Sequence, residues 1–335
     1  GVRLSLVLAS RRGGFQRLSF IRRFAGVTRM LSPYYGLYLV LGLVFRVTEA
    51  VIGLLKLDLV ARALEAKFGN FIIGLNDSRP KEDAPTDSVS KTELDHLAKM
   101  VTFWWNKNGP AKMLHTFYQV RVPLVVEGLA ETGRISKADI SKPDSLKGVR
   151  ILEAGCGGGV LAEDLARLGA YVVGVDPGTE MIDLAKRHLE TDSADLKDRL
   201  EYHAITVEEH AKKFAGTYDA IVCSEVMEHV DEKVPILEAC VRCLKPGGSL
   251  FVTTENQTML AWFVFIIIPE YILKFIPKGT HFYEKFVSPG QISKILDQYQ
   301  CKTKRVRGFF YDRMFNSWSF IESDECNYGL HAVKK

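Results

Sequence analysis

The residues with the clearest chemical meaning in this chain are a run of glycines and, about twenty positions later, a carboxylate. Gly155, Gly157 and Gly159 follow the apolar segment 151–154, and Asp176 ends the next apolar segment. Glycines allow the backbone to turn tightly and to approach a ligand closely, and a carboxylate at this position can accept hydrogen bonds from ribose hydroxyls. Together they predict a site for an adenosine-containing cofactor at the carboxyl edge of a parallel sheet.

Glu153 indicates which cofactor this site prefers. A dinucleotide site normally reads G-x-G-x-x-G and holds a pyrophosphate, whereas these glycines read G-x-G-x-G and Glu153 lies two residues before the first. A carboxylate there would repel a pyrophosphate and would suit a ligand that carries an amino group and a sulfonium. Two alternatives stay open: Gly158 and Gly159 serve only packing, or Asp176 caps a helix that starts near Gly178.

A second group of residues has the spacing of a metal site. Glu225, Glu228 and His229 are related as i, i+3 and i+4, so they share one face of a helical turn just after a predicted strand. Carboxylate oxygens favour Mg²⁺, and the histidine would also admit Mn²⁺ or Zn²⁺. The alternative is that both carboxylates face solvent and His229 caps or packs.

Alternating apolar strands and amphipathic helices must position these residues. Strands are expected near 149–153, 171–175, 201–205, 219–223, 248–254, 301–308 and 327–334, and helices near 92–105, 111–131, 159–168, 178–190 and 233–244. This alternation predicts an α/β, Rossmann-like fold with a seven-stranded, mostly parallel sheet, in which the last two strands are antiparallel. The helices within 92–135 are expected to form a lid over the cofactor pocket of a domain at 148–335.

The segment 258–287 is too apolar for an ordinary loop between a strand and a helix. Its uncharged part is too short to cross about 30 Å of hydrocarbon, and Pro269 interrupts it. Aromatic and aliphatic residues flanked by Lys274 and Lys278 suit a segment that lies in a membrane interface. The alternative is a core helix of a large lid. Either structure predicts a lipophilic substrate.

The N-terminal region differs in composition from the rest of the chain. Residues 1–48 contain no Asp or Glu but several arginines, which is typical of a mitochondrial transit peptide. The alternative is a basic surface arm. The short apolar run 34–45 fits a presequence or an interfacial segment, and 49–91 is interpreted as a variable segment that ends in a polar linker.

Composition and cysteine usage narrow the possible classes further. The chain has 335 residues and a net charge of only +4, which does not by itself indicate a partner nucleic acid. The cysteines fall mainly on predicted strands and the cofactor loop, which indicates reduced thiols. Cys240 and Cys243 have a C-x-x-C spacing, but without a second pair they are weak candidates for zinc or redox chemistry.

Several motifs in order carry a family resemblance. The glycine loop, the strand at 218–223, the turn and strand at 244–252 and the segment 204–209 resemble the motifs of class I S-adenosylmethionine-dependent methyltransferases. Over about 92–335 the resemblance becomes narrower. Phe103-Trp-Trp, Glu225-x-x-Glu-His, the insertion ending Pro277-Lys-Gly-Thr-His and Asn327-Tyr-Gly-Leu-His-Ala resemble the ubiquinone-biosynthesis O-methyltransferase family.

The resemblance implies methylation of a catechol-type hydroxyl on a polyprenylated ring at two steps of ubiquinone biosynthesis. It implies that S-adenosylmethionine is the cofactor and that Mg²⁺ binds Glu225, Glu228 and His229. The expected cofactor contacts are Arg121, Glu153, Gly155, Gly157, Asp176, Ser224, Thr206 and Val207. His115 and, more weakly, His281 are candidates for a general base or a ring contact.

The expected partners and location also come with the family. They are a polyprenylated catechol, the matrix face of the inner mitochondrial membrane reached peripherally through 259–278, and other ubiquinone-biosynthesis proteins in a multi-enzyme complex. Four places depart from the family pattern, namely Tyr118-Gln119, Ser224, Glu255 with Gln257, and Asp312-Arg313. These departures concern the shape of the aromatic pocket rather than the cofactor site.

Four competing functions remain to be separated. A nucleic-acid or protein methyltransferase is disfavoured because no Asn-Pro-Pro-Tyr type motif follows the fourth strand. The others are a nicotinamide dehydrogenase, a methyltransferase of another lipophilic phenol, and a scaffold that binds the cofactor without turnover.

Overall fold

The computed structural model describes residues 100–273 and 282–335, which all belong to one compact unit, 56–335. The predicted transit segment 1–48, the apolar run 34–45 and the linker within 49–91 lie outside the described residues, as do Lys274, Lys278 and His281. The structure therefore does not test the predictions made for these residues.

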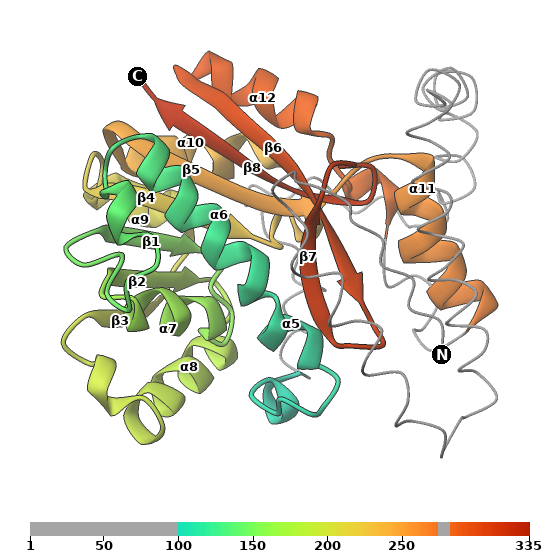
Figure 1. The fold of residues 1–335 in the computed structure, drawn as a ribbon, viewed down its shortest axis with the longest axis horizontal. Coiled ribbons are helices and arrows are strands. Elements are labelled where there is room, and N and C mark those ends of the chain that lie inside the picture. Colours follow the sequence, from blue (N-terminus) through green and yellow to red (C-terminus); the bar gives the residue numbers. More distant parts are fainter. Residues whose placement is uncertain (1–99, 274–281) are drawn as a thin grey trace, which may run out of the picture. The chain divides into compact units, whose positions relative to one another are not determined.

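The described residues form one eight-stranded sheet with the order β3-β2-β1-β4-β5-β8-β6-β7 (Figure 1). The strands are β1 (Arg150–Ala154), β2 (Tyr171–Asp176), β3 (Leu200–Ala204), β4 (Tyr218–Ser224), β5 (Leu244–Glu255), β6 (Cys301–Asp312), β7 (Ser317–Ile321) and β8 (Asn327–Lys334). Strands β1 to β5 are parallel, whereas β8, β6 and β7 are antiparallel to their neighbours. The predicted fold class is confirmed, with an eighth strand because β6 turns back at its end and pairs with β7.

Helices cover both faces of this sheet. They are α5 (Lys112–Thr116), α6 (Tyr118–Glu131), α7 (Val160–Arg167), α8 (Thr179–Thr191), α9 (Val207–Lys213), α10 (Lys233–Cys243) and α12 (Pro289–Gln298), with short turns η2 (Val101–Phe103), η3 (Lys137–Asp139), η4 (Ala194–Leu196), η5 (Met227–His229) and η7 (Tyr283–Lys285). One apolar cluster joins α6, α7 and α8 to the sheet, and a second joins α9, α10 and α12 to it. The central strand β4 is buried along its whole length, which explains the apolar run 220–223 at its centre.

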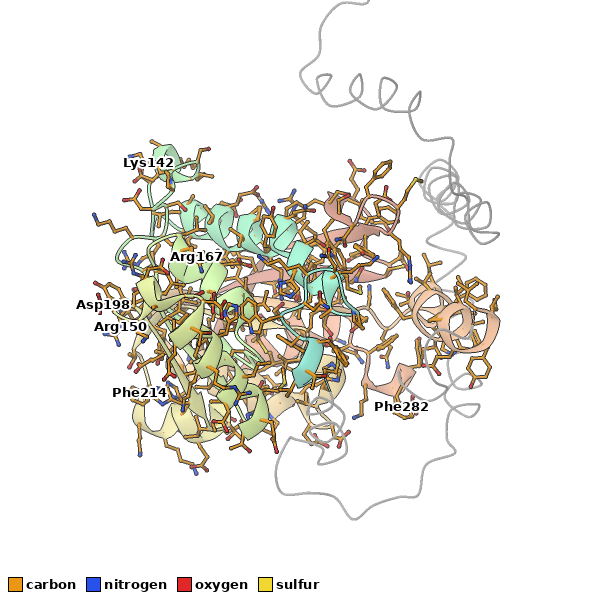
Figure 2. All side chains as sticks on the ribbon, turned by 90° about the horizontal axis from the view of Figure 1, so that it is seen from below. Lys142, Arg150, Arg167, Asp198, Phe214 and Phe282 are labelled. Atoms are coloured by element: carbon orange, nitrogen blue, oxygen red, sulfur yellow. The ribbon has the colours of Figure 1, made fainter. Side chains whose placement is uncertain are left out.

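Side chains fill the space between these layers, while charged residues such as Lys142 and Asp198 lie at the periphery (Figure 2). The sequence patterns placed α7, α8 and α10 within one residue at each end, but they missed α9 and α12. All six cysteines are buried, and none of them forms a disulfide.

The predicted lid differs from the structure in its helices. Within the described part of 92–105 only η2 is helical, because Asn106, Gly109 and Pro110 favour turns and Asn106 accepts a hydrogen bond from the Asn108 N–H at 3.0 Å. The single helix expected at 111–131 is divided into α5 and α6 at Phe117, whose N–H donates to the Leu114 carbonyl at 3.3 Å in a tighter turn.

The apolar insertion is helical where it is described. Helix α11 (Met259–Trp262) continues as the wider π-helix η6 (Phe263–Ile272). One side of it packs in a small apolar cluster around Ile266, Tyr283 and Phe286. Across the described residues, none of the helices combines the length and the apolar character that a bilayer crossing requires.

Candidate functional site

The glycine loop joins β1 to α7 in a conformation that excludes larger residues. Gly155 has φ +74°, and a Cβ atom there would lie 2.4 Å from Val226 Cγ2. A Cβ atom at Gly158 would lie 2.5 Å from the Trp104 ring. At both positions a residue larger than glycine would therefore clash with its neighbours. The backbone N–H groups of the loop lie at the carboxyl edge of the sheet.

Asp176 holds the loop and the start of α8 together. Its Oδ2 accepts a hydrogen bond from the Gly157 N–H at 2.9 Å, and its Oδ1 accepts one from the Gly178 N–H at 2.8 Å. Burial raises the pKa of this carboxyl, and these two hydrogen bonds oppose the shift. The N-cap residue of α8 is Gly178 and no side chain caps this helix, so Asp176 contacts the N-cap residue without capping the helix itself. Each oxygen retains lone pairs, so contact with ribose stays a prediction.

Glu153 is a buried carboxyl with an unsatisfied oxygen beside this loop. It is 3% exposed, and its Oε2 has no hydrogen-bond partner among the described residues. Burial raises the pKa of Glu153 to about 8, while the charge of Arg121 opposes that shift. An orphaned acceptor here fits a cationic ligand such as S-adenosylmethionine, which carries an amino group and a sulfonium.

Arg121 lies on α6 at the centre of several buried carboxyl groups. Its Nη1 donates to Ser224 Oγ at 3.4 Å, and its Nη2 donates to the Leu114 carbonyl at 3.2 Å. Burial lowers the pKa of Arg121, whereas the charges of Glu153, Asp164 and Glu225 raise it. The guanidinium therefore balances charge in the site, and it connects the lid to β4.

Asp164 on α7 is a site residue that the sequence analysis missed. Burial raises its pKa to about 6, and its Oδ2 is buried without a hydrogen-bond partner among the described residues. The feature of the sequence that could have identified Asp164 is its place as a charged residue in the first turns of the amphipathic helix that follows the glycine loop.

Two tryptophans of the lid lie on the glycine loop. Trp105 Nε1 donates to the Gly158 carbonyl at 3.1 Å, and its ring stacks on His188 with the centroids 3.4 Å apart. His115 Nε2 lies 2.8 Å from the Trp104 carbonyl. The structure therefore gives His115 a lid-anchoring contact, and its predicted catalytic role stays a prediction.

The two residues predicted to contact adenine have structural contacts of their own. The Thr206 side chain caps α9 by accepting a hydrogen bond from the Glu209 N–H at 3.2 Å, and Val207 is buried in the core. Their backbone lies directly after β3, at the same edge as Asp176, so the predicted adenine contact remains compatible with their position.

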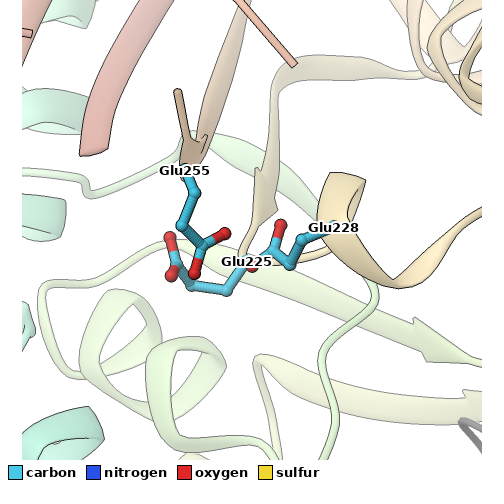
Figure 3. A group of neighbouring side chains, drawn as sticks. All are labelled: Glu225, Glu228 and Glu255. Atoms are coloured by element: carbon cyan, nitrogen blue, oxygen red, sulfur yellow. The ribbon is translucent and has the colours of Figure 1, made fainter. Parts of the chain in front are cut away.

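Three carboxylates meet where β4 and β5 end (Figure 3). One oxygen each of Glu225, Glu228 and Glu255 lies within 4.8 Å of the others. Thr253 Oγ1 donates to Glu225 at 2.8 Å, and Thr254 Oγ1 donates to Glu228 at 2.7 Å. Of the three predicted metal ligands, the structure brings Glu225 and Glu228 together with Glu255, and His229 lies outside this group of three. Their role in metal binding stays a prediction.

The electrostatics of this cluster are those of crowded acids. Burial and the neighbouring Glu228 raise the pKa of Glu225 to about 8, and the same two causes raise the pKa of Glu255 well above its ordinary value. The charges of Arg121 and His229 oppose the shift at Glu225. A nearby positive charge would stabilise the ionised forms of these carboxyls, and carboxylate oxygens are the ligands that hard divalent cations bind.

Comparisons with known proteins agree with this geometry. Residues 152–252 match a family model described as a methyltransferase domain. A magnesium protoporphyrin IX methyltransferase from Synechocystis, solved with S-adenosylhomocysteine bound, superposes with a TM-score of 0.50 at 20% identity and covers 73% of this chain and 95% of its own. The fold and the site therefore define a class I S-adenosylmethionine-dependent methyltransferase.

Sequence relatives narrow the class to a family. The mitochondrial ubiquinone biosynthesis O-methyltransferase of Rattus norvegicus is 39% identical over 249 residues, which are 74% of this chain and 71% of the relative. The ubiquinone biosynthesis O-methyltransferase of Xanthomonas campestris is 34% identical over 255 residues, which are 76% of this chain and 99% of the relative. The chain belongs to the ubiquinone biosynthesis O-methyltransferase family.

Proposed function

We propose that this protein transfers the methyl group of S-adenosylmethionine to a catechol-type hydroxyl of polyprenylated ring intermediates in ubiquinone biosynthesis. The observation that carries the proposal is the glycine loop with the buried carboxyl of Glu153 beside it, which together suit the cofactor. The relatives of this chain are named as ubiquinone biosynthesis O-methyltransferases. The apolar insertion beside the site supports a lipid-tailed acceptor.

The reaction is a direct displacement. S-adenosylmethionine supplies the electrophilic methyl group, so a C–O bond forms as the C–S bond breaks and the catechol proton is lost. A phenol has a pKa of about 10 and is mostly un-ionised near neutral pH. The protein must therefore orient the hydroxyl and stabilise negative charge on its oxygen.

The residues of this chain can perform both tasks. Arg121 connects α6 to the end of β4 through Ser224, and Asp176 holds the glycine loop through the Gly157 N–H. Glu225 and Glu228 would hold Mg²⁺, and its positive charge would stabilise the phenolate. Trp104 and Trp105 cover the glycine loop and exclude water from it.

Product identification tests this function. The purified chain with S-adenosylmethionine and a prenylated catechol is expected to give a product heavier by one methylene, with S-adenosylhomocysteine in equal amount, as measured by mass spectrometry. Transfer to unrelated lipophilic phenols but not to the catechol would indicate a different substrate. Cofactor binding without turnover on any of these acceptors would support a scaffold.

We further propose that the protein is mitochondrial and that the insertion attaches it peripherally to the matrix face of the inner membrane. The support is the exposed apolar side of η6, where Phe263 is 45% and Ile272 is 57% exposed although the opposite side is packed. Apolar side chains that enter the headgroup boundary gain about 1.5–3 kcal/mol each when fully buried, so a few of them suffice for binding.

Replacing Phe263 and Ile272 together by serine is expected to weaken binding to vesicles of cardiolipin and phosphatidylcholine by at least about tenfold, because two apolar contacts are lost. Co-sedimentation measures the change. The matched control replaces Met314 and Phe315, which are similarly exposed at 42% and 52%, and should bind like the unaltered protein. Equal losses in both variants, or no loss in either, would refute attachment through the insertion.

A further inference from the structure

We propose that His188 on α8 is a positioning residue for cofactor binding, because its ring holds Trp105 of the lid against the glycine loop. His188 acts through Trp105 and not through the reacting atoms. The inference concerns the S-adenosylmethionine site that the fold defines, so it does not depend on which acceptor is methylated.

The rings of Trp105 and His188 are in face-to-face contact. Their centroids are 3.4 Å apart and their planes differ by 3°. The His188 side chain is 19% exposed, so most of this contact is shielded from water. Aromatic contacts of this kind are favourable beyond the apolar area that they bury. His188 therefore forms a flat surface on which the Trp105 ring lies.

A hydrogen-bond network fixes the orientation of His188. Its Nδ1 lies 2.7 Å from Oε1 of Glu163 on α7, whose side chain is 4% exposed. Ser193 Oγ donates to Glu163 Oε2, and Arg167 Nη2 donates to Ser193 Oγ at 2.7 Å. A carboxyl group that is held in this way sets the direction of the imidazole bonded to it. The ring face offered to Trp105 is thus fixed by both α7 and α8.

Trp105 carries this orientation to the glycine loop. Its Nε1 donates to the Gly158 carbonyl at 3.1 Å, and a Cβ atom at Gly158 would lie 2.5 Å from the ring of the preceding residue, Trp104. On α5, His115 lies with its centroid 5.6 Å from that of Trp105, at a tilt of 53°, so it contacts this ring less closely than His188 does. The position of the lid on the loop therefore depends mainly on His188.

The imidazole uses different parts for its two contacts. Its edge, at Nδ1, bonds to Glu163, and its face stacks on Trp105. A purely structural role would require the edge contact, which connects α8 to α7. A role in positioning the lid requires the face. Substitutions that keep one contact and remove the other can therefore separate the two roles.

Isothermal titration calorimetry of the full chain with S-adenosylhomocysteine tests the proposal. His188→Ala removes both contacts and is expected to weaken binding about tenfold, because the stack is lost and the hydrogen bond from Trp105 to Gly158 is less well held. His188→Phe keeps a flat ring and should bind within about threefold of the unaltered protein. His188→Asn keeps a donor for Glu163 without the ring and should remain about tenfold weaker. Arg187→Ala, at an exposed position next to His188 on α8, is the control and should bind like the unaltered protein.

A double-mutant cycle shows whether His188 acts through Trp105. Trp105→Ala removes the other half of the stack and should weaken binding at least as much as His188→Ala does. Combining the two substitutions should change the affinity of Trp105→Ala by less than about twofold, because the ring that His188 positions is already absent. Circular dichroism verifies folding, and if His188→Ala does not fold, His188→Asn takes its place in the cycle.

Three results would overturn the assignment: additive losses in the double variant, an Asn variant that binds as tightly as the Phe variant, or a folded His188→Ala that binds within twofold of the unaltered protein. If the affinities follow the expected order but no catechol is methylated, the proposed function fails and the role of His188 stands. If a catechol is methylated but the affinities do not follow this order, the proposed function stands and the role of His188 is refuted.

Discussion

Replacing Asp176 by alanine should lower the affinity for S-adenosylhomocysteine by more than about 100-fold. The variant loses the two hydrogen bonds that Asp176 is predicted to accept from the ribose hydroxyls, and its side chain no longer holds the loop through the Gly157 and Gly178 N–H groups. Hydrogen bonds to a charged group contribute about 1.5–3 kcal/mol each, so the two ribose contacts account for about 3 kcal/mol or more. That free energy corresponds to roughly two orders of magnitude in the dissociation constant.

Isothermal titration calorimetry with S-adenosylhomocysteine measures this change. Asp183→Ala is the matched control, because Asp183 lies on the same helix, α8, and its side chain is exposed. The control should bind like the unaltered protein, and far-ultraviolet circular dichroism should show that both variants are folded. An Asp176→Ala variant that is folded and binds within threefold of the unaltered protein would contradict a cofactor site at this loop.

Arg121→Met is expected to have the largest effect on stability. The guanidinium is 4% exposed and interacts with the charges of Glu153, Asp164 and Glu225, so its removal leaves buried acids without their cation. Breaking a buried charge pair by removing one partner typically costs about 3–5 kcal/mol. Urea unfolding followed by tryptophan fluorescence measures the loss.

The loss should increase with pH. Burial raises the pKa values of Glu153 and Glu225 to about 8 and that of Asp164 to about 6, so the folded protein retains protons that the unfolded chain has released. Stability therefore falls as pH rises toward these values, and Arg121 opposes the fall by favouring the ionised forms. The variant should be closer to the unaltered protein at pH 6 than at pH 8.5.

Arg305→Met separates this effect from a general loss of positive charge. Arg305 is 41% exposed and pairs with Glu127 at 3.6 Å and with Glu131, whose side chains are 39% and 35% exposed. Exposed pairs contribute about 0–1 kcal/mol, so this variant should be only slightly destabilised, with little dependence on pH. Similar losses for the two arginine variants would show that Arg121 has no special role in the buried site.

Much of the site follows from local patterns in the sequence. The glycine spacing, the carboxylate after β2 and the apolar run of β4 each reflect a constraint within a few residues, because backbone sterics and burial act locally. Gly155 and Asp176 therefore occupy the predicted edge of the sheet, and the two late strands, β6 and β8, form the expected antiparallel pair. The family motifs also lie within single elements or the turns that join them.

The sequence by itself determined the class of fold, the cofactor loop and the pairing of Glu225 with Glu228. Only the tertiary structure showed that Glu255 joins them, since neighbours on adjacent parallel strands are about thirty residues apart in the chain. The burial of Arg121 among Glu153 and Asp164 was likewise decided in three dimensions, because it depends on how α6 and α7 pack on the sheet. Spacing along a helix grouped His229 with Glu225 and Glu228, whereas the register of the sheet placed Glu255 beside these two carboxylates.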